Sequence, residues 1–120
     1  METGKTADFQ KRTFEYALRV LRLVESLPKN ETNSILDKQL LRSGTSVGAN
    51  SRAAKRSRSR AESVSKMGIV EEEADESMFW IELLTASGKV SAAKVEGLLK
   101  ETDEILAITV PSIKTARFRK

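Results

Sequence analysis

The stretch that decides the fold is Leu36–Arg60, which reads LDKQLLRSGTSVGANSRAAKRSRSR. Its apolar and small residues recur at helical spacing, along a stripe of Leu36, Leu40, Ser43, Val47, Asn50 and Ala54. Gly44 and Gly48 lie within this stretch, and each glycine costs a helix about 1 kcal/mol relative to alanine. A loop over residues 43–48 is therefore one interpretation. We favour a continuous helix, because the stripe keeps its register across both glycines and small side chains let another helix come close.

The composition favours a single helical domain. Of the 120 residues, 39% are apolar and 5% aromatic, with only six glycines and two prolines to interrupt helices. No apolar run approaches the roughly 18 residues that span a bilayer. The first residues, METGKTADF, lack the apolar core of a signal peptide. We expect one domain over residues 1–120 that is cytoplasmic and does not associate with a membrane.

Three more amphipathic segments accompany this stretch. We expect four helices, over residues 8–27, 33–57, 60–87 and 91–110. The expected N-caps are Asp8, Thr32 or Asn33, and Ser91, and the expected helix ends are set by Pro28 and Gly88. Pro111 costs a helix interior about 3 kcal/mol, so the fourth helix is expected to break near Val110. Because short connections imply antiparallel neighbours, the sequence predicts an all-α, antiparallel up-down-up-down four-helix bundle.

Polar residues on the core-facing side of the second helix need hydrogen-bond partners. We predict an internal polar network in which the Arg42 guanidinium meets the carboxylate of Glu73 or Glu76. The expected members are Gln39, Arg42, Asn50, Glu73 and Glu76. The alternative is that Arg42 extends along its aliphatic stem to reach water.

A cluster of cations follows the second helix, in a chain of net charge +4. This basic cluster consists of Arg52, Lys55, Arg56, Arg58 and Arg60, and no acid follows it until Glu62. A basic tail over residues 114–120, expected to be mobile, adds Lys114, Arg117, Arg119 and Lys120. Arginine binds phosphate through its planar fork of donors, so these residues are candidate contacts to nucleic acid. The alternative is a solvated helix end that pairs with the acids of the third helix.

The chain lacks the residues of most catalytic and metal sites. It has no cysteine and no histidine, which excludes thiol nucleophiles, imidazole catalysis and typical zinc sites. Glu72 and Glu76 lie one helical turn apart, but carboxylate di-iron bundles use Glu-x-x-His pairs. Ser43 and Ser46 have no plausible base beside them. We therefore expect no catalytic residue, no metal, no cofactor and no enzymatic activity.

The order of several motifs resembles a known family. The motifs are LP at 27–28, QLLRSGTSVGAN at 39–50, KMGIVEEEADESMFWIELL at 66–84, ILAI at 105–108 and SIKTA at 112–116. They resemble the four-helix bundle proteins encoded within intervening sequences of bacterial 23S ribosomal RNA genes, over about residues 9–116. The resemblance implies a bundle that assembles as a ring, a homopentamer. It also implies a distant kinship with the accessory protein of diversity-generating retroelements, a basic pentamer that works with a reverse transcriptase and nucleic acid.

The chain departs from that family pattern at four positions. Ser51 replaces an aliphatic residue, Ala53 a glutamate, Val64 an aromatic residue, and Pro111 a residue compatible with a helix. The first two changes make the end of the second helix less apolar and less acidic, so the local field is more positive.

Two functions from different classes fit these residues. The first is a non-enzymatic homo-oligomer that binds RNA or DNA phosphates through its basic surface. The alternative is a structural or adaptor oligomer that binds a protein partner without nucleic acid, because the helix over residues 60–87 carries apolar residues on two faces. The resemblance implies no enzymatic activity and does not decide between the two.

Overall fold

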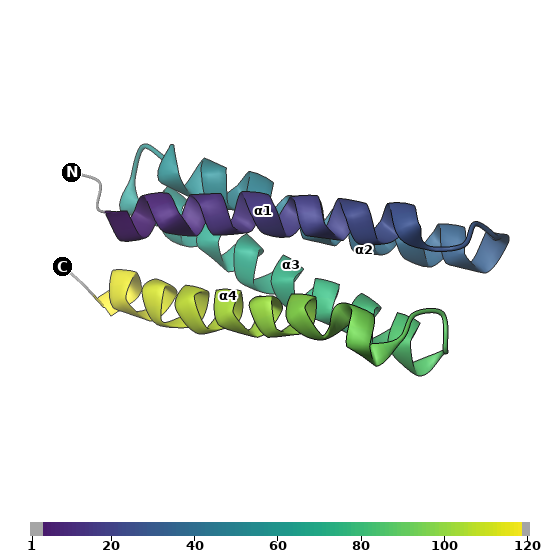
Figure 1. Cartoon of the computed structure of the whole chain (residues 1–120). Coiled ribbons are helices and arrows are strands. Elements are labelled where there is room, and N and C mark those ends of the chain that lie inside the picture. The colour runs from purple at the N-terminus through teal and green to yellow at the C-terminus, as the bar shows by residue number, and fades with distance from the viewer. Residues whose placement is uncertain (1–3, 119–120) are drawn as a thin grey trace.

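The computed structural model describes the backbone of residues 4–118 and the side chains of residues 8–114. Four helices form the fold: α1 (Gly4–Ser26), α2 (Glu31–Lys55), α3 (Arg60–Ala86) and α4 (Ala92–Phe118). The described residues contain no strand. Successive helices run in opposite directions, so both termini and the α2–α3 connection lie at the same end of the bundle (Figure 1). The predicted up-down-up-down four-helix bundle is confirmed, with principal extents of 50 × 22 × 21 Å.

Each helix packs against the next one in the chain, and α4 also packs against α1. The pairs α1–α2 and α2–α3 are the most extensively packed, and α1–α4 is the loosest of the neighbouring pairs. The core is aliphatic apart from Tyr16, which is fully buried. No helix in the described residues is long and apolar enough to cross a membrane.

The glycines of α2 explain its close approach to α1. The helix continues through both of them, so the loop over residues 43–48 is wrong. A Cβ atom added at Gly44 would lie 2.7 Å from both Cγ atoms of Val20. One added at Gly48 would lie 3.0 Å from the backbone oxygen of Thr13. Two larger residues here would separate the helices, so the glycines offset their cost in helix propensity by permitting this packing.

A layer of buried hydroxyl groups crosses the centre of the bundle. The Tyr16 hydroxyl of α1 shares a 2.7 Å hydrogen bond with Thr102 Oγ1 of α4, and Ser77 Oγ of α3 donates to Ser43 Oγ of α2 at 2.9 Å. Burial raises the pKa of the Tyr16 phenol, and hydrogen bonds with Thr102 and Ser77 partly oppose this rise. Since a buried hydroxyl without a partner is costly, this layer holds the four helices in register.

Two expected helix starts are wrong. The first helix begins at Gly4, so Asp8 lies inside it. The N-cap of α2 is Asn30, whose side-chain oxygen accepts a hydrogen bond from the backbone N–H of Asn33 at 2.8 Å. Asn33 itself cannot serve as the cap because its side chain donates to the Pro28 carbonyl and closes the α1–α2 loop.

The remaining helix ends follow the expected local chemistry. The Ser91 hydroxyl accepts from the backbone N–H of Lys94 at 3.3 Å at the start of α4. Gly88 follows the end of α3 with φ of +81°, the left-handed conformation that favours glycine. The connection between α2 and α3 covers residues 56–59, two residues longer than the predicted helix bounds allowed, and α3 begins at Arg60 as predicted.

The expected break of α4 at Pro111 is also wrong. The helix continues through Pro111 to Phe118, so residues 114–118 belong to α4 and do not form a tail outside the helix. Both Pro111 and Ala107 are exposed, which lets the proline ring lie outside the core and the Ala107 carbonyl bond to water. Ile113 is buried two residues beyond Pro111, and its packing helps hold the helix past the proline.

Candidate nucleic-acid interface

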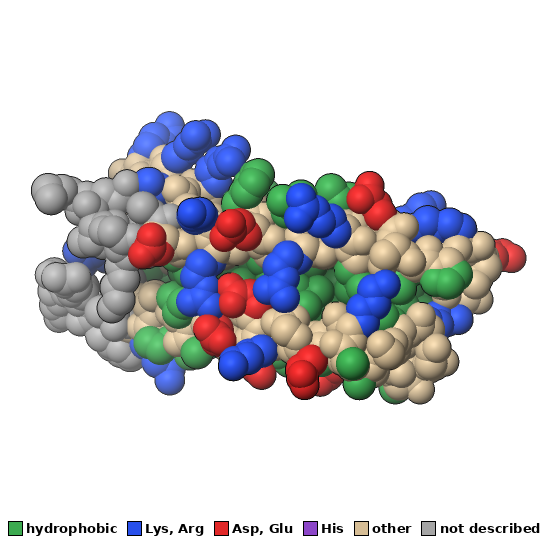
Figure 2. All heavy atoms as spheres, viewed as in Figure 1, with side chains coloured by type: hydrophobic (Ala, Val, Ile, Leu, Met, Phe, Trp, Pro, Cys, Tyr) green, Lys and Arg blue, Asp and Glu red, His purple; other side chains and the backbone are tan. Residues whose placement is uncertain are grey.

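The basic cluster lies at the corner where α2 passes into α3. Arg52 and Lys55 belong to the last turn of α2, Arg56 is its C-cap residue, and Arg60 is the first residue of α3. The Arg56 backbone N–H bonds to the Arg52 carbonyl at 3.1 Å, and the Ser59 hydroxyl caps α3. These two helix ends turn the chain sharply. All five side chains of the cluster are exposed. Basic side chains gather at this corner of the molecule in Figure 2.

Two acids of α3 pair with a residue away from the basic cluster. Within the cluster, the Arg58 guanidinium lies 3.9 Å from the Glu62 carboxylate, and the Arg58 side chain is 92% exposed. Such an exposed pair one turn apart contributes little free energy. Glu73 and Glu76 pair with Arg42, well along the helix from the corner. The carboxylates of Glu73 and Glu76 are therefore engaged away from the cluster.

The basic surface continues onto α1 and α4. Arg52 lines a shallow depression of about 270 Å³ together with Lys11 and Phe14 of α1, an arrangement that was not predicted from the sequence. Lys114 is exposed near the end of α4, at the same end of the bundle (Figure 1). Arg117 belongs to α4, but its side chain lies outside the described residues, as do Arg119 and Lys120.

The predicted polar network is smaller and more exposed than expected. Arg42 donates to Glu73 Oε2 at 2.9 Å and also to Glu76 Oε2, which accepts a 2.9 Å hydrogen bond from Trp80 Nε1. The Trp80 and Arg42 hydrogen bonds lower the pKa of Glu76, while those from Arg42 to Glu73 and Glu76 raise the pKa of Arg42. The Arg42 side chain is 50% exposed, so this network lies at the α2–α3 edge and not in the interior.

Two predicted members do not join that network. The Asn50 amide donates within α2, to the Ser46 backbone oxygen at 3.0 Å and the Ser46 hydroxyl at 2.9 Å. Gln39 is half-buried and makes no hydrogen bond to Arg42 or its carboxylates among the described contacts. The network therefore reduces to Arg42, Glu73, Glu76 and Trp80.

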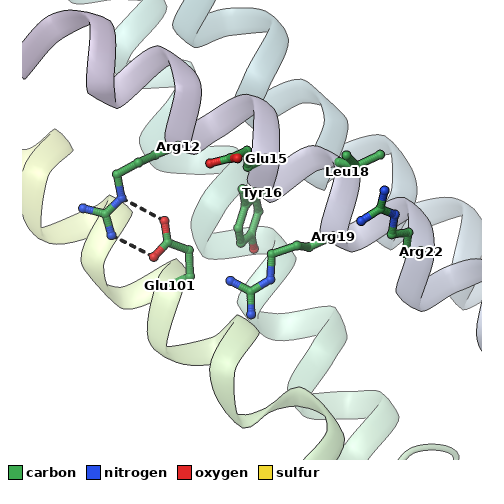
Figure 3. A pocket seen from close by; sticks show the side chains of 7 residues that line it. All are labelled: Arg12, Glu15, Tyr16, Leu18, Arg19, Arg22 and Glu101. Atoms are coloured by element: carbon green, nitrogen blue, oxygen red, sulfur yellow. Dashed lines mark hydrogen bonds and ion pairs between the residues drawn. The ribbon is translucent and has the colours of Figure 1, made fainter.

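A clamp between α1 and α4 was not predicted from the sequence. Arg12 Nε and Nη2 donate to the two carboxylate oxygens of Glu101 at 2.9 and 2.7 Å (Figure 3). Arg12 Nη2 also donates to Glu104 at 2.8 Å. These bonds raise the pKa of Arg12 above its ordinary value. The available signal was the spacing of Glu101 and Glu104, which places both carboxylates on one face of the last helix.

An open groove of about 770 Å³ lies beside the basic cluster. Its lining includes Phe9, Ser51, Val64, Met67 and Pro111, so it draws on all four helices. Ser51 is buried, and its hydroxyl oxygen has no hydrogen-bond partner. Three of the four departures from the family pattern therefore line one groove.

No group of three acidic side chains suited to a metal ion occurs in the part of the chain that the structure describes.

Comparisons with known proteins agree with this architecture. The family model of the 23S rRNA-intervening sequence protein matches residues 5–110. The crystal structure of a protein with unknown function from the S23 ribosomal protein family of Bacteroides thetaiotaomicron is 33% identical, with a TM-score of 0.86. That similarity covers 92% of this chain and 99% of the other. No curated protein matches the chain. The chain belongs to the 23S rRNA-intervening sequence protein family.

Proposed function

We propose that this protein is a non-enzymatic homo-oligomer that binds RNA or DNA through the phosphates. The observation that carries the proposal is the exposure of all five cluster side chains at one corner, with Lys114 at the same end of the bundle. Phosphate contacts of this kind position a nucleic acid without reading its bases, so weak sequence specificity is expected. In a ring, each protomer repeats the cluster, and several modest patches combine into one large basic surface.

Exposed apolar side chains support self-association. Phe79 and Leu83 lie one turn apart on α3 and are 54% and 38% exposed, and Ile35 of α2 is 61% exposed. The hydrogen bond between Ser43 and Ser77 sets the antiparallel register, which places Ile35 level with Thr85, two residues from Leu83. Large apolar side chains on adjacent helices favour a protein contact. The family resemblance suggests that the contact is a second copy and that the ring is a pentamer.

The same apolar side chains favour the alternative function, an adaptor oligomer that binds a protein partner without nucleic acid. Fluorescence anisotropy of labelled structured RNA and duplex DNA separates the two. We expect binding at low salt that is lost when Arg52, Arg56 and Arg58 are changed to glutamine. Binding that does not depend on these three cations would remove the basic cluster as the working surface and favour the adaptor.

A further inference from the structure

The loose seam between α1 and α4 contains a second set of cations, which the proposed interface does not use. A groove of about 480 Å³ runs along this seam, lined by Arg12, Glu15, Tyr16, Arg19, Arg22 and Glu101 among others. Figure 3 shows Arg12 and Glu101 joined across one part of the groove, with Arg19 and Arg22 farther along α1. The groove is therefore chemically divided: one part is closed by an ion pair, and the other holds two guanidiniums.

Arg19 reaches across the seam toward a position of α4 that has no side chain. A Cβ atom at Gly97 would lie 3.1 Å from Arg19 Nη2, so the guanidinium lies directly over the α4 backbone. Arg19 also influences the phenol of the buried Tyr16 at the floor of the seam. The Arg19 side chain is therefore exposed to solvent while its guanidinium lies against the α4 backbone.

The nearest carboxylates of the groove do not neutralise these two guanidiniums. Both oxygens of Glu101 accept hydrogen bonds from Arg12. Glu15 lines the groove but makes no ion pair with Arg19 or Arg22 among the described side chains. Arg19 and Arg22 lie three residues apart and are neighbours on the helix surface. Two guanidiniums that line one groove without carboxylate partners match an oxyanion that accepts several hydrogen bonds.

We propose that this groove is a phosphate-binding site in which Arg19 and Arg22 hold one phosphate group. A free nucleotide and a nucleic-acid backbone both present this chemistry. The site does not depend on the basic cluster, because it lies on the α1–α4 face and the cluster lies at the α2–α3 corner. With two charge-assisted contacts, a dissociation constant on the order of 1 mM is expected for a single phosphate.

Isothermal titration calorimetry tests this site with inorganic phosphate, AMP and a short single-stranded RNA, in a low-salt buffer free of other oxyanions. The variant R19Q/R22Q removes both charges but keeps polar side chains of moderate length. Its matched control, K38Q/K94Q, removes the same charge at two exposed lysines outside the groove. A third variant, E15Q, removes the groove's free carboxylate and should tighten binding a few-fold, a gain that misfolding does not produce.

We expect R19Q/R22Q to weaken phosphate binding about tenfold or more, while K38Q/K94Q binds like the wild type. Binding of inorganic phosphate or AMP would identify a free phosphate ligand, and binding of RNA alone would identify the nucleic-acid backbone. Equal affinity of R19Q/R22Q and wild type for all three probes would overturn the site, as would equal losses in the variant and its control. Loss of RNA binding in R52Q/R56Q/R58Q with phosphate binding intact would show that the cluster and the groove act separately.

Discussion

Gly44 of α2 lies so close to Val20 of α1 that no side chain fits between them without a shift of the helices. A Cβ atom at residue 44 would come within 2.7 Å of both Val20 Cγ atoms, and Val20 is fully buried. The β-branched Val20 side chain has one strongly preferred rotamer in a helix, so it cannot turn aside easily. This contact sets the distance between α1 and α2.

Changing Gly44 to alanine should therefore destabilise the protein even though alanine favours helices. Overpacking costs about 1–3 kcal/mol and the gain in propensity is about 1 kcal/mol, so we expect a net loss of about 1 kcal/mol. Urea unfolding measures it. The matched control is G68A, because a Cβ atom at Gly68 of α3 meets no atom within 4 Å and should stabilise the helix. Equal gains from both substitutions would contradict the close packing.

The clamp between Arg12 and Glu101 should hold the loose α1–α4 seam together. Both side chains are partly buried and share two hydrogen bonds, a geometry stronger than that of an ordinary surface pair. A double-mutant cycle with R12Q and E101Q should give a coupling of about 1 kcal/mol in the free energy of unfolding, reduced at high salt. A coupling near zero would mean that packing alone closes the seam.

Asp37 should make stability fall as the pH rises. It is 5% exposed, neither carboxylate oxygen has a hydrogen bond, and burial raises its pKa although Lys29 lies 3.8 Å away. Because the folded-state pKa exceeds the unfolded value, the folded state binds the proton more tightly. This contribution is present below the unfolded pKa and is lost as the pH rises through the folded pKa.

The variant D37N tests whether the ionised Asp37 carboxylate lowers the stability of the folded protein. Relative to wild type, it should be more stable at pH 7, by an amount on the order of 1 kcal/mol, with the advantage shrinking at pH 3. Urea unfolding at several pH values measures the effect. D103N, at an exposed aspartate, is the control and should show no such trend. A D37N protein less stable than wild type at pH 7 would show that the charge pair with Lys29 outweighs the cost of burial.

Self-association should depend on the apolar side chains of α3. Light scattering of the wild type should give about five times the 13.3 kDa protomer mass. F79S should lower that mass, because Phe79 is half-exposed beside Leu83. F14S makes the same change at an exposed phenylalanine on α1 and should leave the mass unchanged. A monomeric wild type, or a loss of mass caused by F14S alone, would contradict the proposed contact.

Sequence reasoning succeeded where the cause is local and failed where it depends on how helices rotate. The apolar stripe through Gly44 and the serine-rich connection after Lys55 are local patterns, and both led to the observed structure. The Arg12–Glu101 clamp joins residues 89 positions apart, and each residue turns a helix by about 100°, so a small error in rotation moves a side chain off the seam. The break predicted at Pro111 was wrong because the free-energy cost of a proline within a helix depends on whether that face of the helix is exposed. The spacing of apolar residues gives this exposure only approximately.

The most direct test of the central claim is the salt dependence of nucleic-acid affinity. Anisotropy of labelled structured RNA and duplex DNA should be followed across a salt series for wild type, R52Q/R56Q/R58Q and the charge-matched control K38Q/K94Q/K100Q. Each lost phosphate contact should reduce the slope of log K against log salt by about 0.9 for duplex DNA. We predict that the affinity of the wild type falls steeply with salt. Only the cluster variant should bind more weakly and show a shallower slope of log K against log salt. Equal slopes for cluster variant and control, or no binding at low salt by a folded oligomer, would contradict the account.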